Sequence, residues 1–138
     1  MKTTFETRIS PGMCDMNGHL NVAFYAQFFD SACWAFLQEI GGQMDGENLG
    51  WADVQHTTRF LQEVSANKHA EVRSHVLKIG RSSLVTEHQL FIEDDSDPSA
   101  IIEMATVRFD LTDRKAVPLE AELRSTAEAF LAPFNDSD

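Results

Sequence analysis

The chain has 138 residues, 43% of them hydrophobic and 24% charged, which is typical of one globular domain, and we expect residues 1–138 to form it. The formal net charge of −11 argues against a nucleic-acid-binding protein, which would carry a basic surface. No apolar run is long enough for a membrane helix and the N-terminus has no apolar signal core, so we expect no membrane partner and a cytoplasmic location.

The chain opens with a strand-like segment followed by a polar loop. Residues 3–9 alternate between apolar and polar side chains, which predicts a first strand. Pro11-Gly12 ends that strand. The following residues, 14–21, are rich in Asp, Asn, Gly and His, which is typical of a loop.

A long helix is predicted next. From Asn21 to about Ile40 the side chains are apolar almost all round, so we expect this helix to be buried on most sides. Asn21 is a suitable N-cap, and Gly41-Gly42 is a suitable C-terminal end.

Four strand-like runs and a short helical pattern follow. The runs are 52–64, 69–79, 83–92 and 101–111, and the helical pattern starts after Pro118. The first run places Val54, Thr58, Phe60 and Val64 on one face, together with His56. In the last run two sets of residues alternate: Ile101, Ala105, Val107, Phe109 and Leu111 on one face, and Thr106, Arg108 and Asp110 on the other.

The order of these elements predicts an α+β fold. One strand, a long apolar helix and four further strands are accommodated by an antiparallel five-stranded sheet wrapped around one long central helix. The helix would then fill the concave face of the sheet.

The loop before the helix reads Asp15-Met16-Asn17-Gly18-His19-Leu20-Asn21. Here the chain resembles the hotdog-fold acyl-CoA thioesterases, in particular the 4-hydroxybenzoyl-CoA thioesterase-like branch and the plant acyl-carrier-protein thioesterases. Members of both branches have an Asp in this loop and a Tyr ten residues later, as Asp15 and Tyr25 are placed here. The bacterial branch has an acidic residue fifteen positions after the Asp, which matches Asp30.

The resemblance extends more weakly along the chain. Residues 78–84 are similar to a Gly-x-Ser hairpin common in the family, and Pro118-Leu119 is similar to its C-terminal Pro-hydrophobic step. Val22 departs from the family pattern, which often has a second Asn there, and no Pro follows Phe60.

The resemblance implies hydrolysis of an acyl-CoA thioester to free acid and coenzyme A, with no cofactor. Asp15 would attack the thioester carbonyl or activate a water. Asn17 and His19 would orient Asp15 or polarise the carbonyl. The unpaired amides at the helix N-terminus, near Asn21 and Val22, would stabilise the oxyanion.

Substrate positioning is assigned to further residues by the resemblance. Tyr25 and Asp30 would position the substrate. The phosphates of coenzyme A would contact Lys78, Arg81, Ser82 and Ser83. The acyl pocket would depend on how four aromatic residues pack: Phe24, Phe28, Trp51 and Phe60.

Several other interpretations stay open at this stage. Asp15 could cap its own turn without taking part in chemistry. The fold also supports enoyl-CoA hydratases or dehydratases, whose loop has a Pro where Gly18 stands, and non-catalytic acyl-binding modules. The cysteines, Cys14 and Cys33, and the scattered histidines fit neither a nucleophile nor a zinc site well.

A homodimer or homotetramer is expected. A small curled sheet leaves open edges, and hotdog domains pair at such edges with their sites at the interface. Arg59 or Glu63 could then serve the site of a neighbouring subunit.

Overall fold

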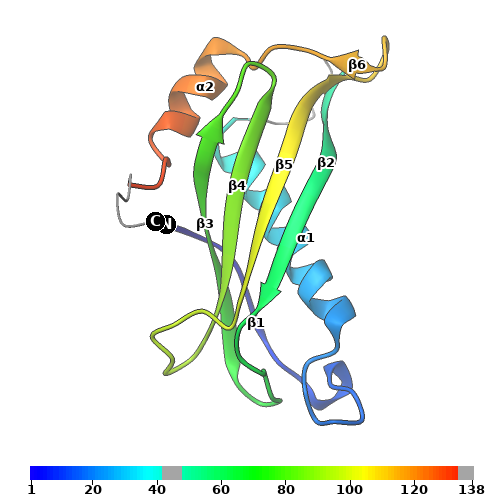
Figure 1. The fold of residues 1–138 in the computed structure, drawn as a ribbon, viewed down its shortest axis with the longest axis vertical. Coiled ribbons are helices and arrows are strands. Elements are labelled where there is room, and N and C mark those ends of the chain that lie inside the picture. Colours follow the sequence, from blue (N-terminus) through cyan, green and yellow to red (C-terminus); the bar gives the residue numbers. More distant parts are fainter. Residues whose placement is uncertain (42–47, 134–138) are drawn as a thin grey trace.

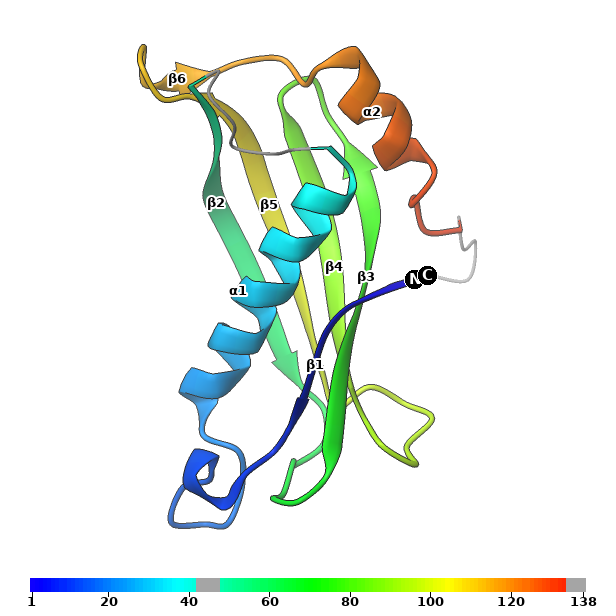
Figure 2. The same ribbon diagram turned by 180° about the vertical axis from the view of Figure 1, so that it is seen from behind.

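A single antiparallel sheet and one long helix across it make up most of the molecule (Figures 1 and 2). The computed structural model describes residues 1–41 and 48–133. The elements in this part of the chain are β1 (Lys2–Arg8), the 3-10 turn η1 (Pro11–Met13), α1 (Val22–Glu39), β2 (Leu49–Phe60), β3 (His69–Ile79), β4 (Ser83–Ile92), β5 (Ala100–Asp110), β6 (Lys115–Ala116) and α2 (Ala121–Glu128).

The sheet has the order β1-β3-β4-β5-β2, and every neighbouring pair is antiparallel. The two-residue strand β6 pairs with the end of β5, so the described sheet has six strands where the sequence predicts five. In the described part of the chain β1 and β2 are the edge strands. No described helix is long and apolar enough to cross a bilayer.

The ends of α1 confirm the sequence prediction. Asn21 is the N-cap, with extended backbone angles, and its side-chain oxygen accepts a hydrogen bond from the Ala23 amide at 3.0 Å. At the other end Ile40 is the C-cap and Gly41 has φ +93°, a left-handed conformation that glycine adopts without strain. Gly42 lies outside the described residues.

A smaller part of the α1 surface is buried than its composition predicts. One face is buried against the sheet: Tyr25, Phe28, Phe29, Ala32, Cys33, Phe36 and Leu37. The opposite face is open in the single chain, with Val22 64% exposed and Trp34 37% exposed. The prediction of a helix buried on most sides is therefore wrong for one chain, because the sheet covers a stripe of the helix and does not surround it.

A β-bulge at Val54 changes the face of β2 that meets the helix. The pairing with β5 shifts register between Asp53 and Gln55, so Val54 is 62% exposed. As a result, Asp53 and His56 both pair with residues of β5 that face the helix. The prediction that Val54 shares a face with His56 is wrong, because strict alternation does not allow for the extra residue.

The two faces of β5 do not follow the expected pattern, in which apolar side chains point towards the helix and polar side chains point away from it. Thr106 and Arg108 are buried on the helix side, whereas Val107 and Phe109 are partly exposed on the outer side. Buried Arg108 forms two hydrogen bonds to the carboxylate of Glu120, at 3.0 and 2.9 Å. A buried charge is acceptable there because it is paired.

The remaining predicted elements are confirmed, except that the strand predicted over 52–64 ends at Phe60. β3 and β4 match the predicted ranges, joined by a turn at residues 80–82, and α2 follows Pro118 with Leu123 and Ala127 buried.

Candidate active site

Asp15 lies in a tight loop that its own carboxylate organises. Its Oδ1 accepts hydrogen bonds from the backbone amides of Asn17, at 2.9 Å, and His19, at 3.4 Å. Gly18, at φ +78°, makes a turn that a residue with a side chain would enter with strain. The Asp15 side chain is thus held in place, and its Oδ2 has no hydrogen-bond partner among the described residues.

A cavity of about 550 Å³ opens beside this loop. Its walls come from the loop, the start of α1 and the end of β2: Asp15, His19, Leu20, Asn21, Val22, Tyr25, Phe60, Leu61, Gln62 and Glu63. Nε2 of His19 contacts a carboxylate oxygen of Glu63. The predicted Asp, His and helix start are therefore together in one cavity.

The amides at the start of α1 are not equally available. The Asn21 amide donates to the Met13 carbonyl oxygen at 2.9 Å, and the Phe24 amide donates to the Asn21 carbonyl oxygen at 2.9 Å. The Ala23 amide donates to the Asn21 side chain. The Val22 amide has no partner among the described residues, so it remains as the donor that can receive a developing negative charge.

A second cavity, of about 500 Å³, continues from the first between α1 and β2. We call it the α1–β2 groove. It is lined by Val22, Tyr25, Ala26, Phe29, Asp30, Asp53, His56, Thr58, Phe60, Ile102 and Met104. Val22, Tyr25 and Phe60 line both cavities. An extended ligand bound at the start of α1 can therefore reach from one cavity into the other.

Tyr25 and Asp30 occupy different parts of this space. The Tyr25 ring packs edge-on against Phe60, with ring centroids 5.0 Å apart. Burial, with a smaller contribution from Cys14, raises the pKa of Tyr25. Its hydroxyl is therefore kept protonated and can act as a hydrogen-bond donor. Asp30 is exposed and lies in the α1–β2 groove, apart from the Asp15 cavity.

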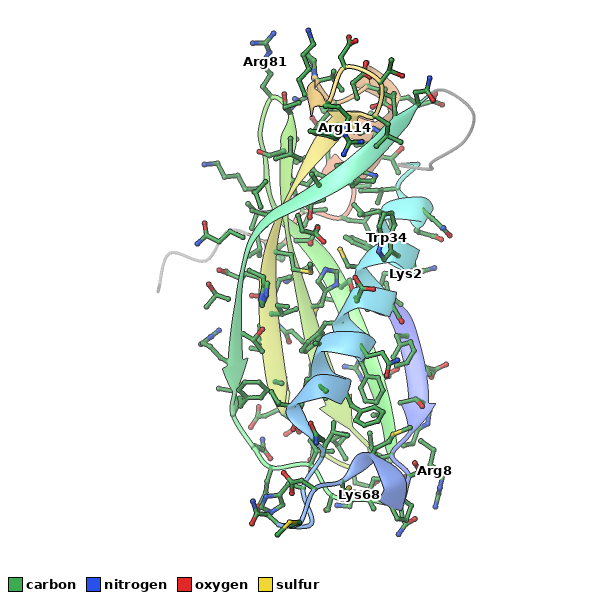
Figure 3. All side chains as sticks on the ribbon, turned by 90° about the vertical axis from the view of Figure 1, so that its right-hand side faces the viewer. Lys2, Arg8, Trp34, Lys68, Arg81 and Arg114 are labelled. Atoms are coloured by element: carbon green, nitrogen blue, oxygen red, sulfur yellow. The ribbon has the colours of Figure 1, made fainter. Side chains whose placement is uncertain are left out.

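The predicted phosphate contacts lie elsewhere. Lys78, Arg81, Ser82 and Ser83 are at the β3–β4 turn, and Figure 3 shows Arg81 at the end of the molecule opposite to the start of α1. The structure does not bring them to the Asp15 cavity of the same chain.

Two other basic residues lie at the end where α1 begins. Figure 3 shows Arg8 and Lys68 there, and the Ile9 amide donates to the Lys68 carbonyl oxygen at 2.9 Å. Neither side chain forms an ion pair with a described residue.

The aromatic residues predicted to shape the acyl pocket are mostly not those that line the two cavities. Of the four aromatic residues expected to shape it, only Phe60 lines either cavity; Phe28 packs on Phe5 in the core, and Trp51 packs on Arg108. Asp53 was not singled out. The sequence gives no signal that distinguishes it, because much of the rest of β2 is also polar, with Gln55, His56, Thr57, Thr58 and Arg59.

Neither Cys33 nor a cluster of metal ligands provides an alternative centre in the described part of the chain. Burial, then Asp53 and Asp30, raises the pKa of Cys33 to about 12, which keeps the thiol neutral and unreactive. No group of three or more His, Cys, Asp or Glu side chains in residues 1–41 and 48–133 could hold a metal ion.

Comparisons with known proteins indicate the family. The profile of the thioesterase-like superfamily matches residues 9–127. A betainyl-CoA thioesterase from Pseudomonas aeruginosa is 31% identical over 133 residues, covering 93% of this chain and 82% of that protein.

Solved structures share the fold. The PA5185 protein of Pseudomonas aeruginosa has a TM-score of 0.84 at 24% identity, over 96% of this chain and 92% of that one. The SAV2348 protein of Staphylococcus aureus, solved in complex with CoA, has a TM-score of 0.84 at 15% identity, over 97% and 89%. A gentisyl-coenzyme A thioesterase, BH1999, has a TM-score of 0.76 at 20% identity, over 89% and 98%.

Proposed function

This chain belongs to the thioesterase-like superfamily and is a thioester hydrolase, and we propose that it hydrolyses coenzyme A thioesters at the amino end of α1 with Asp15 as the catalytic group. One observation carries the proposal. Asp15 and Val22 line the same cavity, and neither the Asp15 Oδ2 nor the Val22 amide has a hydrogen-bond partner in residues 1–41 and 48–133.

Each of these groups answers one requirement of the reaction. The thioester carbon needs a nucleophile, which is either the Asp15 carboxylate or a water that Asp15 deprotonates. The carbonyl oxygen becomes negative as the new bond forms, and the Val22 amide donates to it. Because α1 has 18 residues, its N-terminus adds a partial positive charge at the same point. The C–S bond then breaks and coenzyme A leaves as the thiol. The free acid forms directly when water is the nucleophile, or after water hydrolyses the acyl-Asp15 anhydride when the carboxylate attacks.

The other loop residues support this arrangement. The amides of Asn17 and His19 fix the orientation of the Asp15 carboxylate. The His19 side chain, held by Glu63, and the Tyr25 hydroxyl border the space in which the thioester would lie. We assign them positioning roles.

The phosphates of coenzyme A need cations, and the two cavities contain no described Lys or Arg. Arg8 and Lys68 are at the correct end of the same chain, which makes them candidates for these contacts. Lys78, Arg81, Ser82 and Ser83 could serve only the site of another copy.

A second copy is part of the proposal. The α1–β2 groove lies beside β2, an edge strand that pairs only with β5 among the described strands. Pairing of two β2 edges would close both grooves and form a homodimer, which could assemble further into a homotetramer.

The test is thiol release from a panel of acyl-CoAs that includes betainyl-CoA, the thioester for which the 31% identical relative is named. Asp15→Asn keeps an oxygen that can accept the two loop hydrogen bonds, so the loop should persist while the carboxylate charge is lost. We expect Asp15→Asn and Asp15→Ala to abolish measurable turnover, and Asp97→Asn, in an exposed loop outside both cavities, to retain it. Full activity in both Asp15 variants would remove Asp15 from the mechanism. Hydration of an enoyl-CoA without thiol release would indicate a hydratase instead.

A further inference from the structure

The open edge of β2 is arranged symmetrically about its bulge. The residues of β2 that pair with the buried, helix-facing residues of β5 are Trp51, Asp53, His56, Thr58 and Phe60. They are odd-numbered before the bulge and even-numbered after it, because two residues, at positions 54 and 55, separate Asp53 from His56. The alternation of faces is therefore the same when it is followed in either direction from a point between positions 54 and 55.

The backbone groups of β2 have the same symmetry. The Leu111 amide donates to the Asn48 carbonyl oxygen at 2.8 Å, and the Leu61 amide donates to the Ser99 carbonyl oxygen at 2.9 Å, so both ends of β2 are bonded towards the chain of β5. Successive residues of a strand direct their N–H and C=O groups to alternate sides. The residues that direct these groups to the open edge are therefore the helix-facing ones, together with Leu49, and no described strand pairs on that side.

Such an edge pairs with a second copy of itself in one register without conflict. Two identical edges that meet antiparallel are related by a two-fold axis. With the axis between positions 54 and 55, position 53 lies opposite 56, 51 opposite 58 and 49 opposite 60, so helix-facing residues meet helix-facing residues throughout. A shift by one position would turn every such pair into a mismatch of faces. A shift by two positions would leave a mismatch beside the axis, where 55 meets 56 or 53 meets 54.

The side chains that meet in this register are complementary. Asp53 lies opposite the partner's His56, and by symmetry His56 lies opposite the partner's Asp53. An imidazole N–H can donate to a carboxylate whether or not the ring is charged. Phe60, which is 53% exposed in the single chain, lies opposite the partner's Leu49. In the registers shifted by two positions Asp53 loses its imidazole partner.

We propose that the bulge at Val54 fixes the register in which β2 pairs with β2 of a second copy, so that the partner's His56 completes the α1–β2 groove beside Asp53. Asp53 and His56 both line this groove, and each groove of the dimer therefore contains such a pair formed across the axis. The inference rests on the β2 pairing of the proposed function and adds to it the register and the residue that the partner contributes.

Cysteine cross-linking measures the register directly. Ala52 and Thr57 pair with outward-facing residues of β5 and line neither cavity of the site. In the proposed register Ala52 lies opposite the partner's Thr57 in a non-hydrogen-bonded pair, with Cα atoms about 4.5 Å apart, which a disulfide can span. Within one chain the two positions are about 16 Å apart, too far for a bond. Cys14→Ser removes the partly exposed native thiol, and buried Cys33 is kept.

We expect mild oxidation of Ala52→Cys/Thr57→Cys to give a covalent dimer on a non-reducing gel. Two matched controls, Ala52→Cys/Arg59→Cys and Ala52→Cys/Gln55→Cys, correspond to the registers shifted by two positions in either direction and should give none. Each single cysteine variant should also give none.

A charge exchange tests the contact between Asp53 and the partner's His56. His56→Asp places two carboxylates opposite one another at both symmetric positions, so it should raise the dimer Kd by about 10-fold, whereas His56→Asn should raise it less. A mixture of His56→Asp and Asp53→His chains should form heterodimers well above the statistical share of about half, because only the heterodimer has unlike groups opposite one another at both positions. Native mass spectrometry counts the three species, and repulsion within one chain would not favour the heterodimer.

Three results would overturn the inference: no covalent dimer from Ala52→Cys/Thr57→Cys, cross-linking of a control pair in its place, or heterodimers at or below the statistical share. If the wild type still sediments as a dimer and Asp15→Asn still abolishes thiol release, the proposed function stands in each of these cases. A monomeric wild type would reject both the register and the β2 pairing.

Discussion

At the scale of single residues, the proposed chemistry depends on one carboxylate and one backbone amide. Asp15 is held by its own loop, and Val22 is the first residue of α1. The amide of Val22 can be deleted with little disturbance, because proline is well tolerated at the first position of a helix. Asn21 also has φ −66° and ψ 138°, angles that suit a residue preceding proline.

We therefore predict that Val22→Pro lowers kcat by about 100- to 1,000-fold, because it removes the oxyanion donor. Val22→Ala, which keeps the amide, should turn over at close to the wild-type rate. Steady-state thiol release with an unchanged circular dichroism spectrum is the measurement. A proline variant as active as the alanine variant would place the oxyanion elsewhere.

At the scale of secondary-structure elements, the N-cap of α1 connects stability to the site. The Asn21 side chain accepts from Ala23, and its backbone accepts from Phe24, so the turn that presents the Val22 amide is fixed by this residue. No acidic residue in the first turn supports the helix start in addition.

Asn21→Ala should lower the free energy of unfolding by about 1 kcal/mol, the usual cost of losing an N-cap acceptor. Asn21→Ser, which keeps an acceptor, should lose only a few tenths of that amount. Urea denaturation of the two variants at equal protein concentration compares them. Equal stability of Asn21→Ala and the wild type would mean that the cap contributes nothing.

The elements also show what sequence can and cannot predict. Strands β3 and β4, helix α1 and its cap follow from local periodicity and capping residues, and these predictions are confirmed. The Asp15 loop could be found because its residues are neighbours in sequence. Asp53 could not, because the bulge at Val54 that turns it towards the helix depends on pairing with β5.

Which face of β5 meets the helix could not be predicted from the sequence either. Thr106 and Arg108 face the helix because their polar atoms find partners there, in Asp53 and Glu120, and such partners are distant in sequence. Hydrophobic alternation alone gives no information about them.

At the scale of the whole molecule, the open edge of β2 predicts self-association. Val54 is 62% exposed on that edge, and Phe60 is 53% exposed. Sedimentation at micromolar concentration should give the mass of a dimer or tetramer, and Val54→Lys should shift it towards the monomer. A wild-type chain that sediments as a monomer with full activity would contradict this prediction.

A buried histidine predicts how stability depends on pH. His88 is fully buried between Ser74 and Thr86, and burial lowers its pKa to about 3. In the unfolded chain the same group binds a proton below its ordinary pKa of about 6.5. The unfolded state therefore binds more protons between these values, and stability is lost as the pH falls.

We expect the free energy of unfolding to decrease by roughly 1.5 kcal/mol from pH 6.5 to pH 5 through His88 alone. His88→Gln should be less stable at neutral pH but should vary less over this interval. An unchanged slope in His88→Gln would show that other groups cause the pH dependence.

The most direct test of the whole account is a crystal structure of the Asp15→Asn variant with an intact acyl-CoA. We predict the thioester carbonyl oxygen within about 3 Å of the Val22 amide nitrogen, with the carbonyl carbon facing the side chain at position 15. A thioester bound away from the start of α1, with the Val22 amide in contact with another protein group, would contradict the account.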